Sequence, residues 1–114
     1  MNVVASTTVD NGGKYQVVMM LDSEPGRGVR AIRINRSTGE AHSLVSAGGF
    51  SVKWRKFKND PGQPDGGTFE LITVADVPER GLRSMLVDVS SGTCWWLETD
   101  STGHQFWTPV APDS

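Results

Sequence analysis

The chain has 114 residues, of which 37% are hydrophobic and 21% charged, and its formal net charge is −2. These values fit one globular domain and exclude a disordered tail, while the lack of an apolar run of roughly 20 residues excludes a membrane-spanning helix. The single cysteine excludes an internal disulfide and a cysteine-rich zinc site, and the absence of a basic and then apolar leader favours a cytoplasmic protein.

The first half of the chain predicts four short β-strands separated by glycine-containing turns. The expected strands span residues 15–21, 29–35, 40–45 and 50–57, and β-branched and aromatic residues dominate them. Gly39 and the pair Gly48-Gly49 end short polar loops, where a tight hairpin needs a positive φ. The strand at 15–21 is apolar on both faces, which predicts burial on both sides.

The second half repeats this pattern. Residues 58–65 are rich in proline and glycine and predict a connector, and strands follow at 69–74, 82–89, 93–98 and 104–110. Residues 28–44 align without a gap to residues 81–97 at a spacing of 53, which matches Gly39 with Gly92. The same spacing matches Trp54 with Trp107, and a spacing of 54 matches Tyr15 with Phe69. We therefore predict one domain built from two repeats, unit one at 12–57 and unit two at 66–110.

Two four-stranded antiparallel meanders predict an all-β fold in one of two forms. They can pack face to face as a sandwich or barrel with pseudo-twofold symmetry. Alternatively, each unit is one blade of a propeller that is completed by oligomerisation, because two blades cannot close a ring.

The turn between the second and third strand of each unit carries a motif. Its pattern, D-x-x-T-G-x-x-W, resembles a short β-repeat of uncharacterised bacterial and phage proteins. Unit two has Asp88, Gly92 and Trp95 with a serine in place of the threonine, while unit one has Thr38-Gly39 with asparagine and histidine in place of the aspartate and tryptophan. The resemblance implies a fold and no activity.

A second resemblance is to small two-repeat sugar-binding propellers that trimerise, which place an arginine in one strand and a tryptophan in a following strand. Arg30 with Trp54, and Arg83 with Trp107, match those places. The resemblance implies a carbohydrate-binding oligomer as an alternative function. Its carboxylate has a match in Glu40 of unit one, but a threonine stands there in unit two.

Charge is divided unevenly between the units, because unit one is basic and unit two acidic. This division indicates either a solvated surface or head-to-tail association of chains. Basic and aromatic residues alternate over residues 50–58, which gives single-stranded nucleic-acid binding as a further alternative. The basic residues of that patch are Lys53, Arg55, Lys56 and Lys58.

The adjacent tryptophans Trp95 and Trp96 point to opposite faces of their strand, so one suits the core and the other a binding surface. Trp107 joins them in the expected partner-binding surface. Cys94 is the sole candidate nucleophile, with His104 as base, but its match to Ala41 in unit one predicts a buried structural thiol. No phosphate-binding, dinucleotide or metal-ligand motif is present, so we expect no catalytic residue, cofactor or metal.

The sequence thus predicts a non-enzymatic β-structured interaction module that forms homo-oligomers and binds a protein partner. Arg30, Trp54, Arg83, Trp95, Trp96 and Trp107 are the expected ligand or partner contacts.

Overall fold

The predicted strands form in nearly the expected places. The computed structural model describes residues 4–5, 14–20, 31–49, 51–61, 68–75 and 82–111. Its strands are β1 (Val4–Ala5), β2 (Tyr15–Met20), β3 (Ala31–Asn35), β4 (Ala41–Gly48), β5 (Ser51–Lys56), β6 (Phe69–Ala75), β7 (Leu82–Asp88), β8 (Cys94–Thr99) and β9 (Gln105–Pro109). The described residues contain no helix, and therefore none that is long and apolar enough to cross a membrane.

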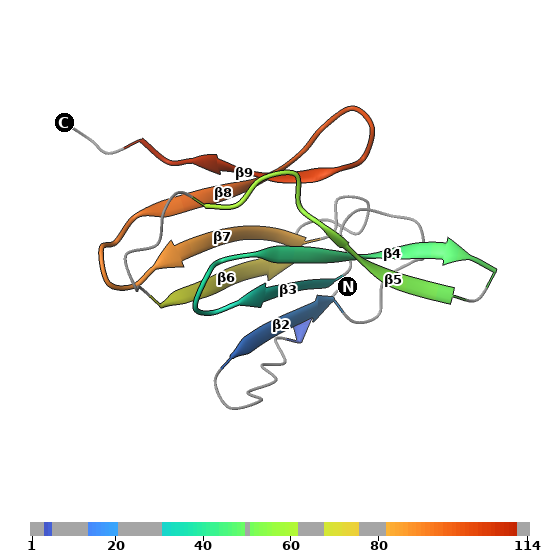
Figure 1. Cartoon of the computed structure of the whole chain (residues 1–114), viewed down its shortest axis with the longest axis horizontal. Helices are drawn as coiled ribbons and strands as arrows, with labels where there is room; N and C mark the ends of the chain where they lie inside the picture. Colours follow the sequence, from blue (N-terminus) through green and yellow to red (C-terminus); the bar gives the residue numbers. More distant parts are fainter. Residues whose placement is uncertain are drawn as a thin grey trace.

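The strands form two antiparallel sheets, one for each half of the chain (Figure 1). The first has the order β1-β2-β3-β4-β5 and the second β6-β7-β8-β9. Neighbours in a sheet are neighbours in sequence, so both sheets are simple meanders. This confirms the all-β fold with two tandem meanders. We refer to β2–β5 as unit one and to β6–β9 as unit two.

The two units have the same internal register. Tyr15 pairs with Asn35 in unit one, and their matches Phe69 and Asp88 pair in unit two. Leu44 likewise pairs with Trp54, as Leu97 does with Trp107. The backbone of the structure therefore repeats with the spacing of the sequence alignment.

The β3–β4 and β7–β8 hairpins share their turn chemistry. The amides of Gly39 and Gly92 donate to the carbonyl oxygens of Asn35 and Asp88, both at 2.7 Å. Both glycines have a positive φ, 77° and 79°. A side-chain oxygen of Asn35 or Asp88 also accepts the amide hydrogen two residues on. An asparagine and an aspartate serve equally here, because each supplies a carbonyl-type acceptor to its own turn.

Each sheet has two faces, named here from the registered rows of side chains. In unit one, face A holds Gln16, Val18, Ile32, Ile34, Ala41, Ser43, Arg55 and Phe57, and face B holds Tyr15, Val17, Arg33, His42, Leu44, Val52, Trp54 and Lys56. In unit two, face A holds Glu70, Ile72, Met85, Val87, Cys94, Trp96, Glu98, Phe106, Thr108 and Val110, and face B holds Phe69, Leu71, Leu86, Trp95, Leu97, Gln105 and Trp107.

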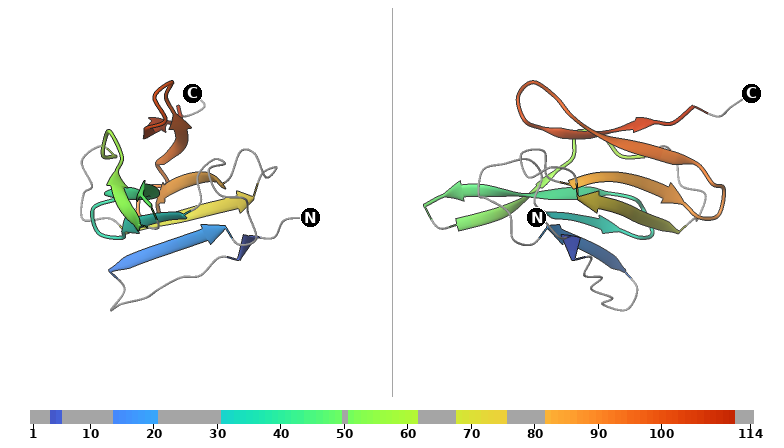
Figure 2. Two further views of the ribbon diagram at one scale, coloured as in Figure 1. Left: turned by 90° about the vertical axis from the view of Figure 1, so that its right-hand side faces the viewer. Right: turned by 180° about the vertical axis from the view of Figure 1, so that it is seen from behind.

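The units pack with face A of unit one against face B of unit two. One cluster of buried side chains from both faces forms the core, namely Val18, Ile32, Ile34, Ala41, Phe57, Phe69, Leu71, Leu86, Trp95 and Trp107. The rings of Phe57 and Trp107 meet across the contact, with centroids 4.9 Å apart. The far half of the β4–β5 hairpin projects beyond unit two (Figure 2), which agrees with the exposure of residues 46–49 and 51–53.

The expectation that the first strand is buried on both sides is wrong. Val18 and Gln16 on face A are buried, but Met19 on face B is 40% exposed and Tyr15 and Val17 are half-buried. The reason is that unit two covers only face A of unit one, so the apolar residues of face B stay near the surface.

Residues 58–61, the described part of the expected connector, pack between the units. The Asn59 side-chain amide donates to the carbonyl oxygen of Trp107 and accepts its amide hydrogen, both at 2.8 Å. Gln16 does the same to Leu71, at 3.0 and 2.8 Å. Each side-chain amide thus takes the place of a neighbouring strand for one residue of unit two.

Candidate interaction site

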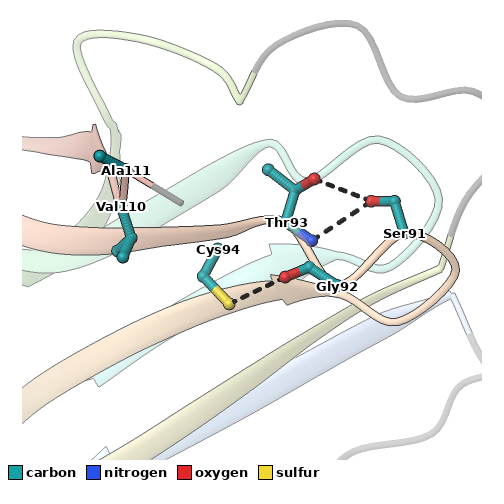
Figure 3. A pocket seen from close by; sticks show the side chains of 6 residues that line it. All are labelled: Ser91, Gly92, Thr93, Cys94, Val110 and Ala111. Atoms are coloured by element: carbon teal, nitrogen blue, oxygen red, sulfur yellow. Dashed lines mark hydrogen bonds between the residues drawn. The ribbon is translucent and has the colours of Figure 1, made fainter. Parts of the chain in front are cut away.

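A hollow lies at one end of unit two, beside the β7–β8 turn (Figure 3). It measures about 300 Å³ and is lined by Ser91, Gly92, Thr93, Cys94, Val110 and Ala111. The turn is held in shape by its own bonds, since the Ser91 hydroxyl donates to Thr93 Oγ1 at 3.0 Å and the Cys94 thiol to the Gly92 carbonyl at 3.4 Å. Gly92 faces open space, because a Cβ atom built there meets nothing within 4 Å.

The matching position in unit one is filled. A Cβ atom at Gly39 would clash with Pro61 and would touch the ring of Phe69 at 3.3 Å. Phe69, which begins unit two, also donates its amide to the carbonyl oxygen of Arg36 at 2.7 Å. Pro61 of the connector and the aromatic ring of Phe69 therefore together occupy in unit one the space that is open in unit two.

The hollow borders an apolar surface formed by face A of unit two. Ile72 is 57% and Val110 is 44% exposed on it, and Met85, Val87 and Trp96 are half-buried. The guanidinium of Arg83 lies 5.6 Å from the ring centre of Trp96, close enough for a cation–π contact. This face combines an aromatic anchor, aliphatic side chains and a hollow, which are features of a protein-docking surface.

Two of the expected contact residues lie in the core. Trp107 is 1% and Trp95 is 8% exposed, and Trp95 packs 6.0 Å from Phe69. As strand alternation predicts, Trp96 lies on the opposite face from Trp95. Of the three tryptophans in unit two, Trp96 is therefore the one that belongs to the candidate surface.

The structure does not bring the expected arginine–tryptophan pairs of a sugar site together in unit two. Arg83 lies over Trp96 on face A, whereas Trp107 is on face B. In unit one, Arg30 lies outside the described residues. The Trp54 ring is covered instead by Arg33, whose guanidinium is 4.9 Å away and also lies 5.4 Å from the ring of Tyr15.

The basic patch is divided by its own strand. Lys53 and Arg55 are on one face of β5 and Lys56 on the other, and residue 50 lies outside the described residues. Arg55 donates to the carbonyl oxygen of Gly103 at 2.6 Å, and Lys58 to Asp100 at 2.7 Å.

Acidic groups neutralise much of this basic charge. Lys56 lies 3.2 Å from Glu40, and Arg36 is paired with Glu70 at 2.5 Å. The pairs Arg36–Glu70 and Lys58–Asp100 join the basic unit one to the acidic unit two within one chain.

Cys94 differs from its prediction, because it is half-buried and lines the hollow. Its match Ala41 is fully buried by unit two, and nothing equivalent covers Cys94 among the described residues. Cys94 begins β8, and His104 follows the turn at the far end of that strand, where its Nδ1 lies 3.0 Å from the Thr102 hydroxyl. A six-residue strand spans roughly 20 Å, so the structure does not assemble thiol and imidazole into a catalytic pair.

Two ionisable groups in the described part of the chain have shifted pKa values. Hydrogen bonds from Lys58, then from Thr102 and the His104 amide, hold the pKa of Asp100 well below its usual range. Desolvation, followed by the charge of Arg33, lowers the pKa of His42 on face B of unit one. Neither group lines the hollow, and no cluster of three histidine, cysteine or acidic residues within the described ranges can hold a metal ion.

The repeat alignment contains the signal for the hollow, although sequence reasoning did not use it. Val110 matches Phe57 and Ala111 matches Lys58, so smaller side chains replace larger ones at these places. Gln16 and Asn59 were also missed, because a polar residue in a strand or a loop gives no sign that it will bond to another unit's backbone.

The fold and this surface define a duplicated β-meander in which face B of unit one and face A of unit two lie outside the shared core. Comparison of the chain with protein-family models, with curated proteins and with solved structures finds no match.

Proposed function

We propose that this protein is a non-enzymatic interaction module that associates with itself through face A of unit two. The observation that carries the proposal is the contrast between matched residues. Val18 and Phe57 of unit one are 0% and 3% exposed, whereas Ile72 and Val110, which match them, are 57% and 44% exposed. Exposed apolar patches on a small soluble domain commonly mark interaction surfaces.

Neither alternative function receives equal support. A sugar site at Arg83 and Trp107 would need groups on one surface, and these two lie on opposite faces of unit two. Binding of single-stranded nucleic acid would need free cations beside exposed rings, but Lys56 and Lys58 are paired with carboxylates. We therefore propose a protein surface as the ligand.

Static light scattering tests the proposal over a range of protein concentrations, at low salt and in sulfate. We expect association that persists or strengthens in sulfate, because an apolar contact gains from this salt whereas surface ion pairs are screened. Ile72→Glu should weaken association at least tenfold. Lys53→Glu is the matched control, because Lys53 is exposed but lies on face A of unit one. A wild-type chain that stays monomeric under all conditions would disprove the proposal.

A further inference from the structure

We infer that the partner on face A of unit two is face B of unit one from a second copy, with Tyr15 of that copy in the hollow beside Gly92. The inference rests on the proposed function and names the partner of the same surface. The contact is head-to-tail, and it repeats between chains the packing that joins the two units within one chain.

The intramolecular contact supplies the template. It joins face A of one unit to face B of the next. The two contacting surfaces are therefore not equivalent, because they are formed by residues at different positions of the repeat. Ser43, for example, donates to Gln105 at 2.7 Å, but the repeat matches these residues to Trp96 and Val52, not to one another. A contact of this heterologous kind leaves one unused copy of each side, and such contacts build rings or filaments.

The exposed hydrophobic residues lie at the positions that this template predicts. Among the described residues, four of the five large exposed apolar side chains match a residue of the intramolecular contact. Val52 matches Gln105, Ile72 matches Val18, Val89 matches Arg36, and Val110 matches Phe57. In the repeated contact, Val52 of one copy meets Trp96 of the other. Polar pairs inside the chain are thus replaced by apolar pairs between chains.

The hollow has a defined occupant in the same template. Phe69 fills the matching space in unit one together with Pro61, and the repeat matches Phe69 to Tyr15. Tyr15 is half-buried at the start of β2, with an aromatic ring close in size to that of Phe69. Its amide would donate to the carbonyl oxygen of Val89, as the Phe69 amide does to that of Arg36. The hollow is therefore incomplete without a residue of the second copy.

Charge does not oppose this pairing. Face B of unit one carries Arg33 and Lys56, of which Lys56 is paired with Glu40, whereas face A of unit two carries Glu98 and Arg83 beside Glu70, which Arg36 already neutralises within the chain. The bonds that Asn59 and Arg55 make within the chain have no counterpart, since the match of Arg55 is Thr108. The contact between copies is accordingly weaker than the contact between units and depends on protein concentration.

Two charged variants test the inference, one on each side of the contact. Val110→Arg places a cation in the hollow, and Val52→Asp places a carboxylate against the ring of Trp96. Both residues are exposed, so both variants should keep the wild-type thermal midpoint. Each variant alone should be monomeric, with association weakened at least tenfold. The reason is that every chain of the Val110 variant has a blocked face A of unit two, and every chain of the Val52 variant has a blocked face B of unit one. Lys53→Glu, an exposed control on face A of unit one and therefore outside the contact, should associate like the wild type.

An equimolar mixture of the two variants is the decisive sample. It should give a species of twice the 12.4 kDa chain mass and nothing larger. The intact face A of unit two in the Val52 variant binds the intact face B of unit one in the Val110 variant, and both outer ends of this dimer are blocked. If the wild type associates but the mixture stays monomeric, or if either variant associates alone, the head-to-tail inference is wrong and the proposed function stands. If the wild type is monomeric at every concentration, the proposed function fails and the inference with it.

Discussion

Gln16 shows how one buried side chain can connect two sheets. Its amide bonds to both backbone groups of Leu71, an edge-strand residue that would otherwise need another strand. Asn59 makes the same pair of bonds to Trp107 from a more exposed position. Buried polar groups that lose their partners are costly, whereas exposed ones are satisfied by water.

Gln16→Leu should therefore destabilise the protein by about 2 kcal/mol, because the Leu71 amide and carbonyl remain buried without partners. Asn59→Leu should cost about 1 kcal/mol or less, since water reaches that site. Urea unfolding followed by circular dichroism measures both. Equal losses for the two variants would contradict the importance of burial at Gln16.

The matched turn glycines allow a second comparison. Alanine at either position costs about 1 kcal/mol, because both residues have a left-handed backbone. Gly39→Ala adds a clash with Pro61, whereas Gly92→Ala meets open space. We expect the midpoint of thermal unfolding to fall further for Gly39→Ala, measured in dilute monomeric protein. Identical midpoints would mean that the space beside Gly39 is not filled by Pro61.

At the scale of elements, eight of the nine strands follow from local sequence. Glycine turns and β-branched runs limit where a strand can begin and end, so the predicted bounds agree with the structure within two or three residues. The strand β1 was not predicted, because two residues paired with Met19 and Met20 carry no pattern of their own. Which face of each strand is buried was harder to predict from the sequence, since the burial of β2 depends on which side of the sheet the other unit covers.

The candidate site could be predicted only in part for the same reason. Alternation places Trp95 and Trp96 on opposite faces, but it does not say which face is the core. The packing of unit one on face B of unit two decides that Trp95 and Trp107 are buried. Charge indicated either a solvated surface or a contact between the basic unit of one chain and the acidic unit of the next. The structure shows pairs of basic and acidic groups within one chain, at Arg36–Glu70 and Lys58–Asp100, which the charge pattern did not predict.

Strand β4 carries a pH-dependent contribution to stability at His42. Desolvation and the nearby Arg33 lower its pKa below 6.5 in the folded chain, so between these two pKa values the unfolded chain binds more protons. Stability should therefore fall as the pH decreases from about 7 through 6.5 to the lower folded-state pKa. His42→Gln should remove this part of the pH dependence. The free energy of unfolding in urea at pH 7.5, 6.5 and 5.5 tests this, and parallel curves for the two proteins would contradict it.

At the scale of the whole molecule, one core serves both units. Phe57 and Val18 of unit one share it with Trp107 and Phe69 of unit two, so neither sheet keeps its buried face when the other unfolds. We expect unfolding in urea to be a single transition, with coincident curves from tryptophan fluorescence and far-ultraviolet circular dichroism. Two separated transitions would show that the units are independently stable.

The directional packing of the units also limits which residues can be exchanged between the repeats. At the turns, the two copies have the same surroundings, so grafting the aspartate of unit two onto Asn35 should be nearly neutral. Within the sheets, matched residues of the two copies have different surroundings. Grafting the indole of Trp96 onto Ser43, which is 2% exposed, would therefore force the sheets apart. The duplicated halves have thus ceased to be spare copies of one another wherever a side chain faces a neighbour, and they remain interchangeable only where the chain reverses direction.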